Sequence, residues 1–442
     1  MKIRGFMVAV VVLAGLTGAL YWSNHQKPAE TAEASADAAP KILSLKQDDI
    51  SKIDLKRKGA DDLVLARDGS GKWRITAPQT LSVDQSTVSP MLSSLSTLTA
   101  ERLVEEKASD LEQYGLSDPA LTAAITEKNN KTQELLLGDN TPAGGAVFAK
   151  LEGDPRIFTI ASYNKGNIDK SANDLRDKRL LTVDADKISK VELITRKEDI
   201  EFGRNKDAWQ IEKPKPLRAD GSQVEELVRI LTEARMDLSG TAEDSKKAAS
   251  AFSAGTPVAT AKVTTESGTQ ELQVRKSKDN YYAKSSAVEG VYKVAGAVGA
   301  GLNKSLDDFR DKKLFDFGFS DPNKIEIHDQ AKSYFLSKGG NDWWNGSGKK
   351  LDAGSAEAVV DKLRDLAAGK FVDSGFTSPA IELSVLSNDG KRLEKVEIAK
   401  KGDGYIAKRE GDASLYQLDA PSVTGLEKAV EGMKVAAAPS GK

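Results

Sequence analysis

The sequence predicts an α+β protein in which an N-terminal transmembrane helix is followed by three tandem α+β repeats with mostly antiparallel sheets. Three observations carry this prediction: an uncharged N-terminal run, a pattern of segments that occurs three times, and alternating apolar segments joined by short turns. The 442 residues are too many for one ordinary domain. Hydrophobic residues make up 39% and charged residues 29%, which is enough apolar material for folded cores.

The N-terminal segment, residues 1–24, is predicted to anchor the chain in a membrane. Lys2 and Arg4 precede an uncharged, mostly apolar run over residues 5–22, which at a rise of about 1.5 Å per residue can cross the hydrocarbon layer. Basic residues before the run and acidic residues after it predict a cytoplasmic N-terminus and an extracytoplasmic bulk. No small-residue cleavage site follows closely, so an uncleaved anchor is favoured over a cleaved signal peptide. Residues 25–45 are predicted to be a flexible tether.

The repeats are defined by one recurring stretch. Residues 71–84 ("GKWRITAPQTLSVD") correspond to residues 207–220 ("DAWQIEKPKPLRAD"), and residues 341–352 ("NDWWNGSGKKLD") form a looser third copy. From this register the units are predicted as repeat 1 over residues 46–182, repeat 2 over residues 183–317, a divergent repeat 3 over residues 318–436, and a disordered tail over residues 437–442.

Each copy carries a tryptophan, an aspartate and then a helical pattern. The tryptophans recur among apolar neighbours, so we interpret them as core or helix-packing residues rather than ligand-stacking platforms. Each aspartate precedes apolar residues at helical spacing, in the same register three times, and is predicted to cap a helix. The signature tryptophans are Trp73, Trp209 and Trp343, and the predicted N-caps are Asp84, Asp220 and Asp352.

Four alternating apolar segments and a closing helix follow, so the predicted unit is three strands, a helix, four strands and a helix. Residues 174–180 ("DLRDKRL") and 308–314 ("DFRDKKL") stand where one unit leads to the next, and we predict that they end the closing helix. Their arginines are predicted to bond acceptors in the neighbouring unit or at their own helix end; an anion site is the competing interpretation. The junction candidates are Asp174, Arg176, Asp177, Asp308, Arg310 and Asp311.

The residue inventory excludes several kinds of chemistry. There is no cysteine, which removes disulfides, thiolate nucleophiles and cysteine-based metal sites. Of the two histidines, His25 lies in the tether and His328 on the solvent side of a predicted strand, where we interpret it as a surface residue. The sequence therefore predicts no catalytic, cofactor-binding or metal-binding residue. With 64 basic and 66 acidic residues, no nucleic acid partner is expected.

These features together resemble a bacterial membrane family catalogued as domain of unknown function four-three-four-zero. The likeness rests on the N-terminal run and on five stretches: "GKWRITAPQTLSVD", "LEQYGLSDPALTAAIT", "ELLLGDNTPAGGAVFAKL", "RIFTI" and "DLRDKRLL". It is weaker in repeat 3, where "WRITAP" has become "WWNGSG". The resemblance implies an association with components of an ABC-type transporter related to gliding-motility systems. It assigns no catalytic residues.

The leading hypothesis is a non-enzymatic, single-pass inner-membrane protein that serves an ABC-type export system as an accessory or scaffold. Its expected partners are the lipid bilayer, through residues 5–22, and a membrane protein of ABC-transporter type. The alternative is an envelope protein that binds glycan or lipid in grooves between units. The least favoured hypothesis is a hydrolase that uses carboxylates alone, for which two facing carboxylates of raised pKa would be needed.

Overall fold

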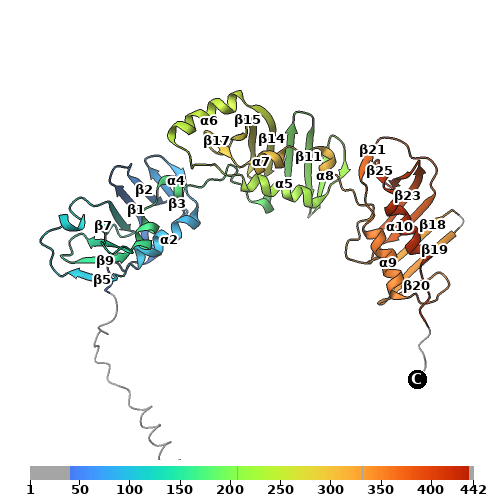
Figure 1. The fold of residues 1–442 in the computed structure, drawn as a ribbon, viewed down its shortest axis with the longest axis horizontal. Helices are drawn as coiled ribbons and strands as arrows, with labels where there is room; N and C mark the ends of the chain where they lie inside the picture. Colours follow the sequence, from blue (N-terminus) through green and yellow to red (C-terminus); the bar gives the residue numbers. More distant parts are fainter. Residues whose placement is uncertain (1–39, 207, 331, 438–442) are drawn as a thin grey trace, which may run out of the picture. The chain divides into compact units, whose positions relative to one another are not determined.

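The computed structural model describes residues 40–437 except residues 207 and 331. The predicted anchor, residues 1–24, lies outside the described residues, as do residues 25–39 of the predicted tether and residues 438–442 of the predicted tail. The end of the predicted tether is wrong, because Ile42 and Leu43 are buried in the core of repeat 1. No helix within the described part of the chain is long and apolar enough to cross a membrane. The chain separates between Asp177 and Lys178 into two compact units, of which the first contains one sheet and the second contains two (Figure 1).

The prediction of mostly antiparallel sheets is confirmed. Each predicted repeat contains one sheet, and the pairings between its named strands are antiparallel. The strand orders are β4-β3-β2-β1-β6-β7-β8-β9-β5, then β13-β12-β11-β10-β14-β15-β16-β17, then β20-β19-β18-β22-β23-β24-β25-β21. The first strand of each repeat therefore lies in the middle of its sheet, beside the first long strand after the helix.

Repeat 1 contains nine strands and three α-helices. Its strands are β1 (Ile50–Arg57), β2 (Leu63–Arg67), β3 (Trp73–Ala77), β4 (Leu81–Ser82), β5 (Arg102–Glu105), β6 (Leu121–Glu127), β7 (Thr132–Asn140), β8 (Ala146–Leu151) and β9 (Ile157–Ala161). Its helices are α2 (Gln85–Ser96), α3 (Ser162–Ile168) and α4 (Ala172–Leu175), with short 3₁₀ helices η1 (Gln47–Asp49) and η2 (Glu112–Tyr114).

Repeat 2 contains eight strands and four α-helices. Its strands are β10 (Lys190–Thr195), β11 (Asp199–Asn205), β12 (Ala208–Lys213), β13 (Leu217–Arg218), β14 (Thr256–Thr265), β15 (Gly268–Ser277), β16 (Asn280–Ser285) and β17 (Val291–Val294). Its helices are α5 (Gly221–Glu233), α6 (Ala242–Ala254), α7 (Gly296–Leu302) and α8 (Leu306–Phe309), after the 3₁₀ helix η3 (Ala185–Lys187).

Repeat 3 contains eight strands and two α-helices. Its strands are β18 (Lys324–Asp329), β19 (Lys332–Gly339), β20 (Asp342–Asn345), β21 (Lys370–Val372), β22 (Ile381–Leu386), β23 (Leu393–Lys401), β24 (Gly404–Arg409) and β25 (Leu415–Leu418). Its helices are α9 (Ala353–Arg364) and α10 (Ala420–Glu431).

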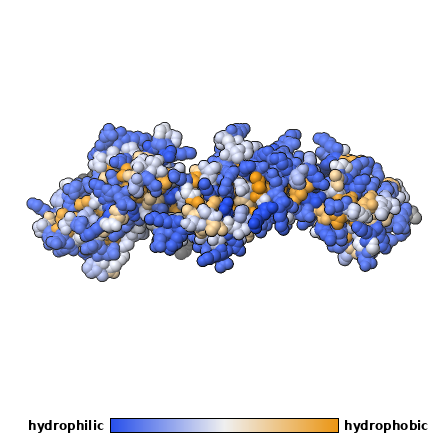
Figure 2. Space-filling view, turned by 90° about the horizontal axis from the view of Figure 1, so that it is seen from above, coloured by the Kyte–Doolittle hydropathy of each residue, from blue (hydrophilic) through white to orange (hydrophobic). Residues whose placement is uncertain are grey.

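The helix after each aspartate begins where the sequence pattern places it. The carboxylates of Asp84, Asp220 and Asp352 accept hydrogen bonds from backbone amides of the first helical turn. The apolar stripe of each helix is buried against its own sheet, and Figure 2 shows a mostly hydrophilic surface outside these cores. Each such helix also contacts a closing helix of its repeat: α2 with α3, α5 with α7, and α9 with α10.

The three signature tryptophans are buried in their own sheets. Each lies on a strand next to the first hairpin and is covered by a basic side chain of the neighbouring strand. The distances from cation to ring centroid are 4.7 Å for Arg67 over Trp73, 5.5 Å for Arg204 over Trp209 and 5.5 Å for Lys338 over Trp343.

Three features of the fold differ from the sequence-based prediction. Short strands that were not predicted lie before or after the first helix: β4 and β5 in repeat 1, β13 in repeat 2 and β21 in repeat 3. Helix α6 was not predicted; it packs against β15–β17, on the side of the sheet away from α5 (Figure 1). The closing helix, predicted as one element, is split into α3 and α4 in repeat 1 and into α7 and α8 in repeat 2. Capping boxes at Ser171 and Ser305 start the second pieces, because each serine competes for local backbone groups and ends the first helix before it.

Candidate functional site

The first two residues of each junction motif end a short helix, as predicted, and the motif then continues as an extended segment. In repeat 2, helix α8 stops at Phe309, and Arg310 has extended backbone angles, φ −77° and ψ 137°. Arg176 is extended in the same way, with φ −65° and ψ 145°. Lys178 and Lys312 therefore do not lie one helical turn after Asp174 and Asp308.

The first half of the junction segment pairs with the edge of the repeat that it leaves. Asp220 N donates to Phe309 O at 2.8 Å, and Asp311 N donates to Arg218 O at 3.1 Å. In repeat 1, Asp84 N donates to Leu175 O at 2.9 Å in the same way. The edge strand next to each capping aspartate is thereby closed by the outgoing chain.

The second half of the segment pairs with the backbone that follows the helix of the next repeat. Leu180 and Leu181 lie in the core of repeat 2, and Leu314, Phe315 and Phe317 lie in the core of repeat 3, so residues 178–182 belong with repeat 2 and residues 312–317 with repeat 3. Leu180 N donates to Ala234 O at 2.8 Å, and Leu314 N donates to Leu366 O at 3.0 Å. At the start of repeat 1, Ile42 N donates to Leu98 O at 2.8 Å. The chain is thus held at the same two places in each repeat, which explains why the motif stands where one repeat leads to the next.

Arg218, at the end of β13, is the centre of a charged network between repeats 2 and 3. Its Nη2 forms ion pairs with Asp311 and with Asp316. Its Nη1 donates to Lys313 O at 2.8 Å and to the hydroxyl of Tyr416 at 3.2 Å. A guanidinium suits this position because its planar fork can serve several acceptors at once.

The network continues into the core of repeat 3. Arg409 Nη2 lies 3.2 Å from Asp316 Oδ2 and 2.9 Å from Glu394 Oε1. The backbone amide of Asp316 donates to both oxygens of Glu394, at 3.2 and 3.1 Å. The side chains of Glu394 and Arg409 are only 4% and 10% exposed, whereas Arg218 is 22% exposed. The charged set is therefore sealed on the repeat 3 side and partly open on the repeat 2 side.

Burial and the two arginines shift these carboxyl groups in different directions. Burial raises the pKa of Glu394 and of Asp311. Burial would also raise the pKa of Asp316, but the guanidinium groups of Arg218 and Arg409 outweigh it, and the net pKa is lowered. Burial, together with the hydrogen bond to Asp412, raises the pKa of Tyr416 to about 12. Tyr416 is therefore a neutral hydroxyl at ordinary pH.

Arg310 contacts both its own helix and the following repeat. Its Nη1 donates to Asp307 Oδ1 at 3.0 Å, and its Nη2 donates to Ser414 Oγ at 2.9 Å. The guanidinium lies 3.3 Å from the ring centroid of Phe371, on the edge strand β21. These contacts fit a seal between repeats 2 and 3.

Three other junction candidates, Asp174, Asp177 and Asp308, form hydrogen bonds within their own repeat, and the backbone amide of Arg176 donates to Ala172 O at 2.9 Å. The carboxylates of Asp174 and Asp308 close the capping boxes with Ser171 and Ser305. Asp177 N donates to Ser82 O at 2.8 Å, the bond that matches Asp311 N to Arg218 O in repeat 2. Of the six candidates, the structure brings Arg310 and Asp311 to the network of Arg218.

Four residues of the network were missed from the sequence: Arg218, Asp316, Glu394 and Arg409. The signal that could have found them is a comparison of copies, because Ser82 stands at the position of Arg218 in repeat 1. Thr182, Gln270 and Ser285 stand at the positions of Asp316, Glu394 and Arg409 in repeat 2. The four charged residues occur together at the junction between repeats 2 and 3, although Arg218 is far from the other three in the chain.

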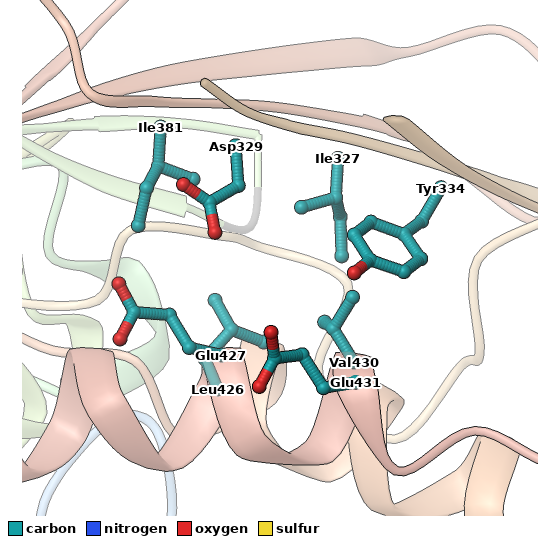
Figure 3. Close-up of a pocket in the computed structure, with 8 residues that line it drawn as sticks. All are labelled: Ile327, Asp329, Tyr334, Ile381, Leu426, Glu427, Val430 and Glu431. Carbon is teal, nitrogen blue, oxygen red and sulfur yellow. The ribbon is translucent and has the colours of Figure 1, made fainter. Parts of the chain in front are cut away.

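A second group of carboxylates lies between the sheet of repeat 3 and α10. Figure 3 shows Asp329 on the strand side and Glu427 and Glu431 on the helix side of a small cavity. The cavity, of about 10 Å³, has space for about one water molecule. Burial, followed by repulsion from Asp329 and Glu431, raises the pKa of Glu427. The cavity is too small for an organic substrate.

Metal and histidine chemistry find no support in the geometry. No group of three or more His, Asp or Glu side chains within the described ranges could hold a metal ion. His328 is half-buried, its Nδ1 lies 2.8 Å from Ser333 Oγ, and its ring centroid lies 5.7 Å from that of Phe335. His328 lies on the sheet face opposite the buried Ile325 and Ile327, as predicted, and its ring contacts Phe335 there.

The comparisons identify a family without a described activity. A tandem α+β chain with one antiparallel sheet per repeat is the class that the fold defines. The family described as Domain of unknown function (DUF4340) matches residues 73–207 and 209–383, and the chain belongs to this family. Both matches begin at a signature tryptophan, Trp73 or Trp209, so they run across the boundaries between sheets.

Other comparisons add little. No curated protein matches the chain. Among solved structures, a DNA polymerase sliding clamp from Pseudomonas aeruginosa, crystallised with a ligand, is 8% identical, with 85% of this chain and 93% of that chain covered. Its TM-score is 0.17, which carries no argument about fold or function.

Proposed function

We propose that this chain is a non-enzymatic, single-pass membrane protein whose three repeats act outside the cytoplasm as an accessory or scaffold component of an ABC-type export system. The family membership supports the domain class. The expected association with components of an ABC transporter rests on the resemblance described above. The single observation that supports the scaffold role is that the buried charged residues of repeat 3 bind neighbouring segments of the chain. Glu394 and Arg409 hold the start of repeat 3 and connect it to Arg218 of repeat 2.

The arrangement does not favour the hydrolase alternative. Asp316 lines an open hollow of about 500 Å³, and its pKa is lowered. Glu394 is buried next to Asp316, and its pKa is raised. An acid–base pair would need one carboxyl group free to meet a substrate proton. Here Asp316 is held by two arginines, and Glu394 is buried and bonded to Arg409 and to the amide of Asp316. This geometry is suited to holding backbone in place.

The experiment is purification of the full-length chain, tagged at its C-terminus, from cross-linked membranes, followed by mass spectrometry. We expect carbonate-resistant membrane association and co-purification of ABC-transporter subunits. A variant that lacks residues 1–24 is the matched control and should leave the membrane fraction. Unchanged membrane association of that variant would contradict the anchor, and the absence of transporter subunits would contradict the scaffold role.

A further inference from the structure

Repeats 1 and 2 end with a short helix that repeat 3 lacks. Helix α4 inserts Leu175 into the core of repeat 1, and α8 inserts Phe309 into the core of repeat 2; both side chains are fully buried. The two segments have a common sequence, which reads "KSANDLRD" at residues 170–177 and "KSLDDFRD" at residues 304–311. The short helices also contact the first helix of their repeats, α2 and α5. Each of them therefore closes one end of its core.

Repeat 3 has no such side chain at the equivalent backbone position. In repeats 1 and 2, the backbone amide of the capping aspartate donates to the carbonyl oxygen of the inserted leucine or phenylalanine. In repeat 3, Asp352 N donates to Lys434 O at 2.8 Å. The side chain of Lys434 is exposed, and Met433 before it is only partly buried. The sequence at residues 429–436 is "AVEGMKVA", in which the common sequence of the short helices is lost.

An open hollow of about 470 Å³ lies beside Met433 in repeat 3. Its apolar lining is contributed by Met433 and four further residues: Tyr334, Leu351, Val430 and Val435. Tyr334, Val430 and Glu431 also line the small cavity in Figure 3, so the hollow and the cavity are neighbours. The end of the core that an inserted side chain closes in repeats 1 and 2 is therefore open in repeat 3.

We propose that this hollow binds a segment of a partner protein that resembles the short helices of repeats 1 and 2, with one helical turn that is capped by a serine and ends in leucine or phenylalanine. The volume of the hollow is within the usual range of ligand sites. An apolar side chain presented by a helix and buried in an apolar groove is a common mode of peptide recognition. The two segments of this chain that have the sequence are held in the cores of their own repeats, so the occupant comes from another protein.

Polar groups at the hollow favour a peptide over a purely apolar molecule. Asn345, Ser347 and Glu431 line it together with the apolar residues. The amide oxygen of Asn345 already accepts from two backbone amides, so its amide hydrogens remain as donors for a peptide carbonyl. In repeat 2, Glu198 Oε2 accepts from the backbone amide of Leu306, the first residue of α8, at 2.7 Å. Glu431 brings a carboxylate to the hollow of repeat 3, and a purely apolar occupant would leave these groups without partners.

The test measures the fluorescence anisotropy of a labelled peptide with the sequence of residues 303–311, titrated with the full-length chain in detergent. A second peptide carries Phe309→Ala. Val435→Trp adds bulk to the lining of the hollow at a side chain that is 51% exposed, so thermal unfolding should be nearly unchanged. The matched control is Leu393→Trp, at a side chain of repeat 3 that is 52% exposed and does not line the hollow.

We expect the wild type and Leu393→Trp to bind the first peptide equally, with a dissociation constant below about 0.2 mM. The dissociation constant should rise at least about tenfold for the alanine peptide and in Val435→Trp, because each change removes the burial of the phenylalanine side chain. No binding by the wild type at about 0.2 mM, equal binding of the two peptides, or unchanged binding by Val435→Trp would overturn the proposal. The site does not rest on the scaffold role, so transporter capture and peptide binding fail separately.

Discussion

Repeats 2 and 3 receive the incoming chain at equivalent places, but with different side chains. In repeat 2 the contacts are neutral: Thr182 N donates to Gln270 Oε1 at 2.9 Å, and Gln270 Nε2 donates to Thr182 Oγ1 at 3.0 Å. Ser285 Oγ donates to Leu180 O nearby. The three matching positions in repeat 3 hold charged residues: Asp316, Glu394 and Arg409.

The difference shows how one architecture can make either a self-contained or a shared contact. A neutral pair that exchanges two hydrogen bonds is complete within its own repeat. A buried charged set is stable only when its charges are paired, and Asp316 takes its second cation, Arg218, from repeat 2. The attachment of repeat 2 is therefore part of the stability of repeat 3.

The largest effect is expected from Arg409→Met, which breaks the comparison on the charged side. The change leaves the buried Glu394 with only the half-exposed Arg392, 3.8 Å away, and leaves Asp316 with Arg218 alone. Breaking a buried pair in this way costs about 3–5 kcal/mol. Hydrogen exchange measured by mass spectrometry on the full chain should show loss of protection across β22–β25. The matched change in repeat 2, Ser285→Ala, removes one neutral hydrogen bond and should cost about 1 kcal/mol.

A triple replacement sharpens the same comparison. Asp316→Thr, Glu394→Gln and Arg409→Ser together give repeat 3 the neutral set of repeat 2. Most of the stability lost in Arg409→Met should return, because no buried charge is left unpaired. Protection in β22–β25 that stays as low as in the single variant would show that the charges do more than pair with one another.

The next largest effect is expected from Arg218→Ser, which introduces the residue found at this position in repeat 1. Because Arg218 is partly exposed, the free energy of unfolding should fall by about 1–3 kcal/mol. The loss of hydrogen-exchange protection should be confined to residues 311–318 and 412–416. Equal deprotection of β10–β12 would contradict the assignment, because these strands do not contact the network through their side chains.

A smaller, pH-dependent effect is expected at Glu201 in repeat 2. Hydrogen bonds from Lys190 and Lys213 lower the pKa of this buried carboxylate to about 2. A lowered pKa means that the stabilisation is present above the ordinary value of 4.5 and is lost as the pH falls toward 2. Glu201→Gln should cost about 1–2 kcal/mol at pH 7, since both lysines are half-exposed and screened. Urea unfolding should also depend less on pH between about 5 and 2.

The smallest effect is expected from His328→Ala. The variant loses one hydrogen bond to Ser333 and one ring contact with Phe335, both at a partly exposed position. The change in the free energy of unfolding should be about 0.5 kcal/mol, measured by urea unfolding at pH 8. A loss of several kcal/mol would contradict the expectation that His328 contributes only its contacts with Ser333 and Phe335.

The repeated pattern made much of the fold predictable, because helix caps and apolar stripes depend on residues close in the chain. Asp84, Asp220 and Asp352 each begin a helix for that reason. The split of the closing helix was not predicted. Helix α6 was not predicted either, because residues 242–254 have no equivalent in repeats 1 and 3. The network of Arg218 could not be assembled from local patterns, because Arg218 lies 93 residues before Asp311 and 98 residues before Asp316 in the chain.

The most direct test of the shared contact is a double-mutant cycle between Arg218→Ala and Asp316→Ala in the full chain, with the free energy of unfolding of repeat 3 measured by hydrogen exchange. Residues that share a charged network couple by about 0.5–3 kcal/mol. If Asp316 takes its second cation from repeat 2, the two changes should be non-additive by at least about 1 kcal/mol, while the cycle between Arg218→Ala and Ser285→Ala should be additive. Additive losses in the first cycle would contradict the claim that repeat 2 contributes to the stability of repeat 3.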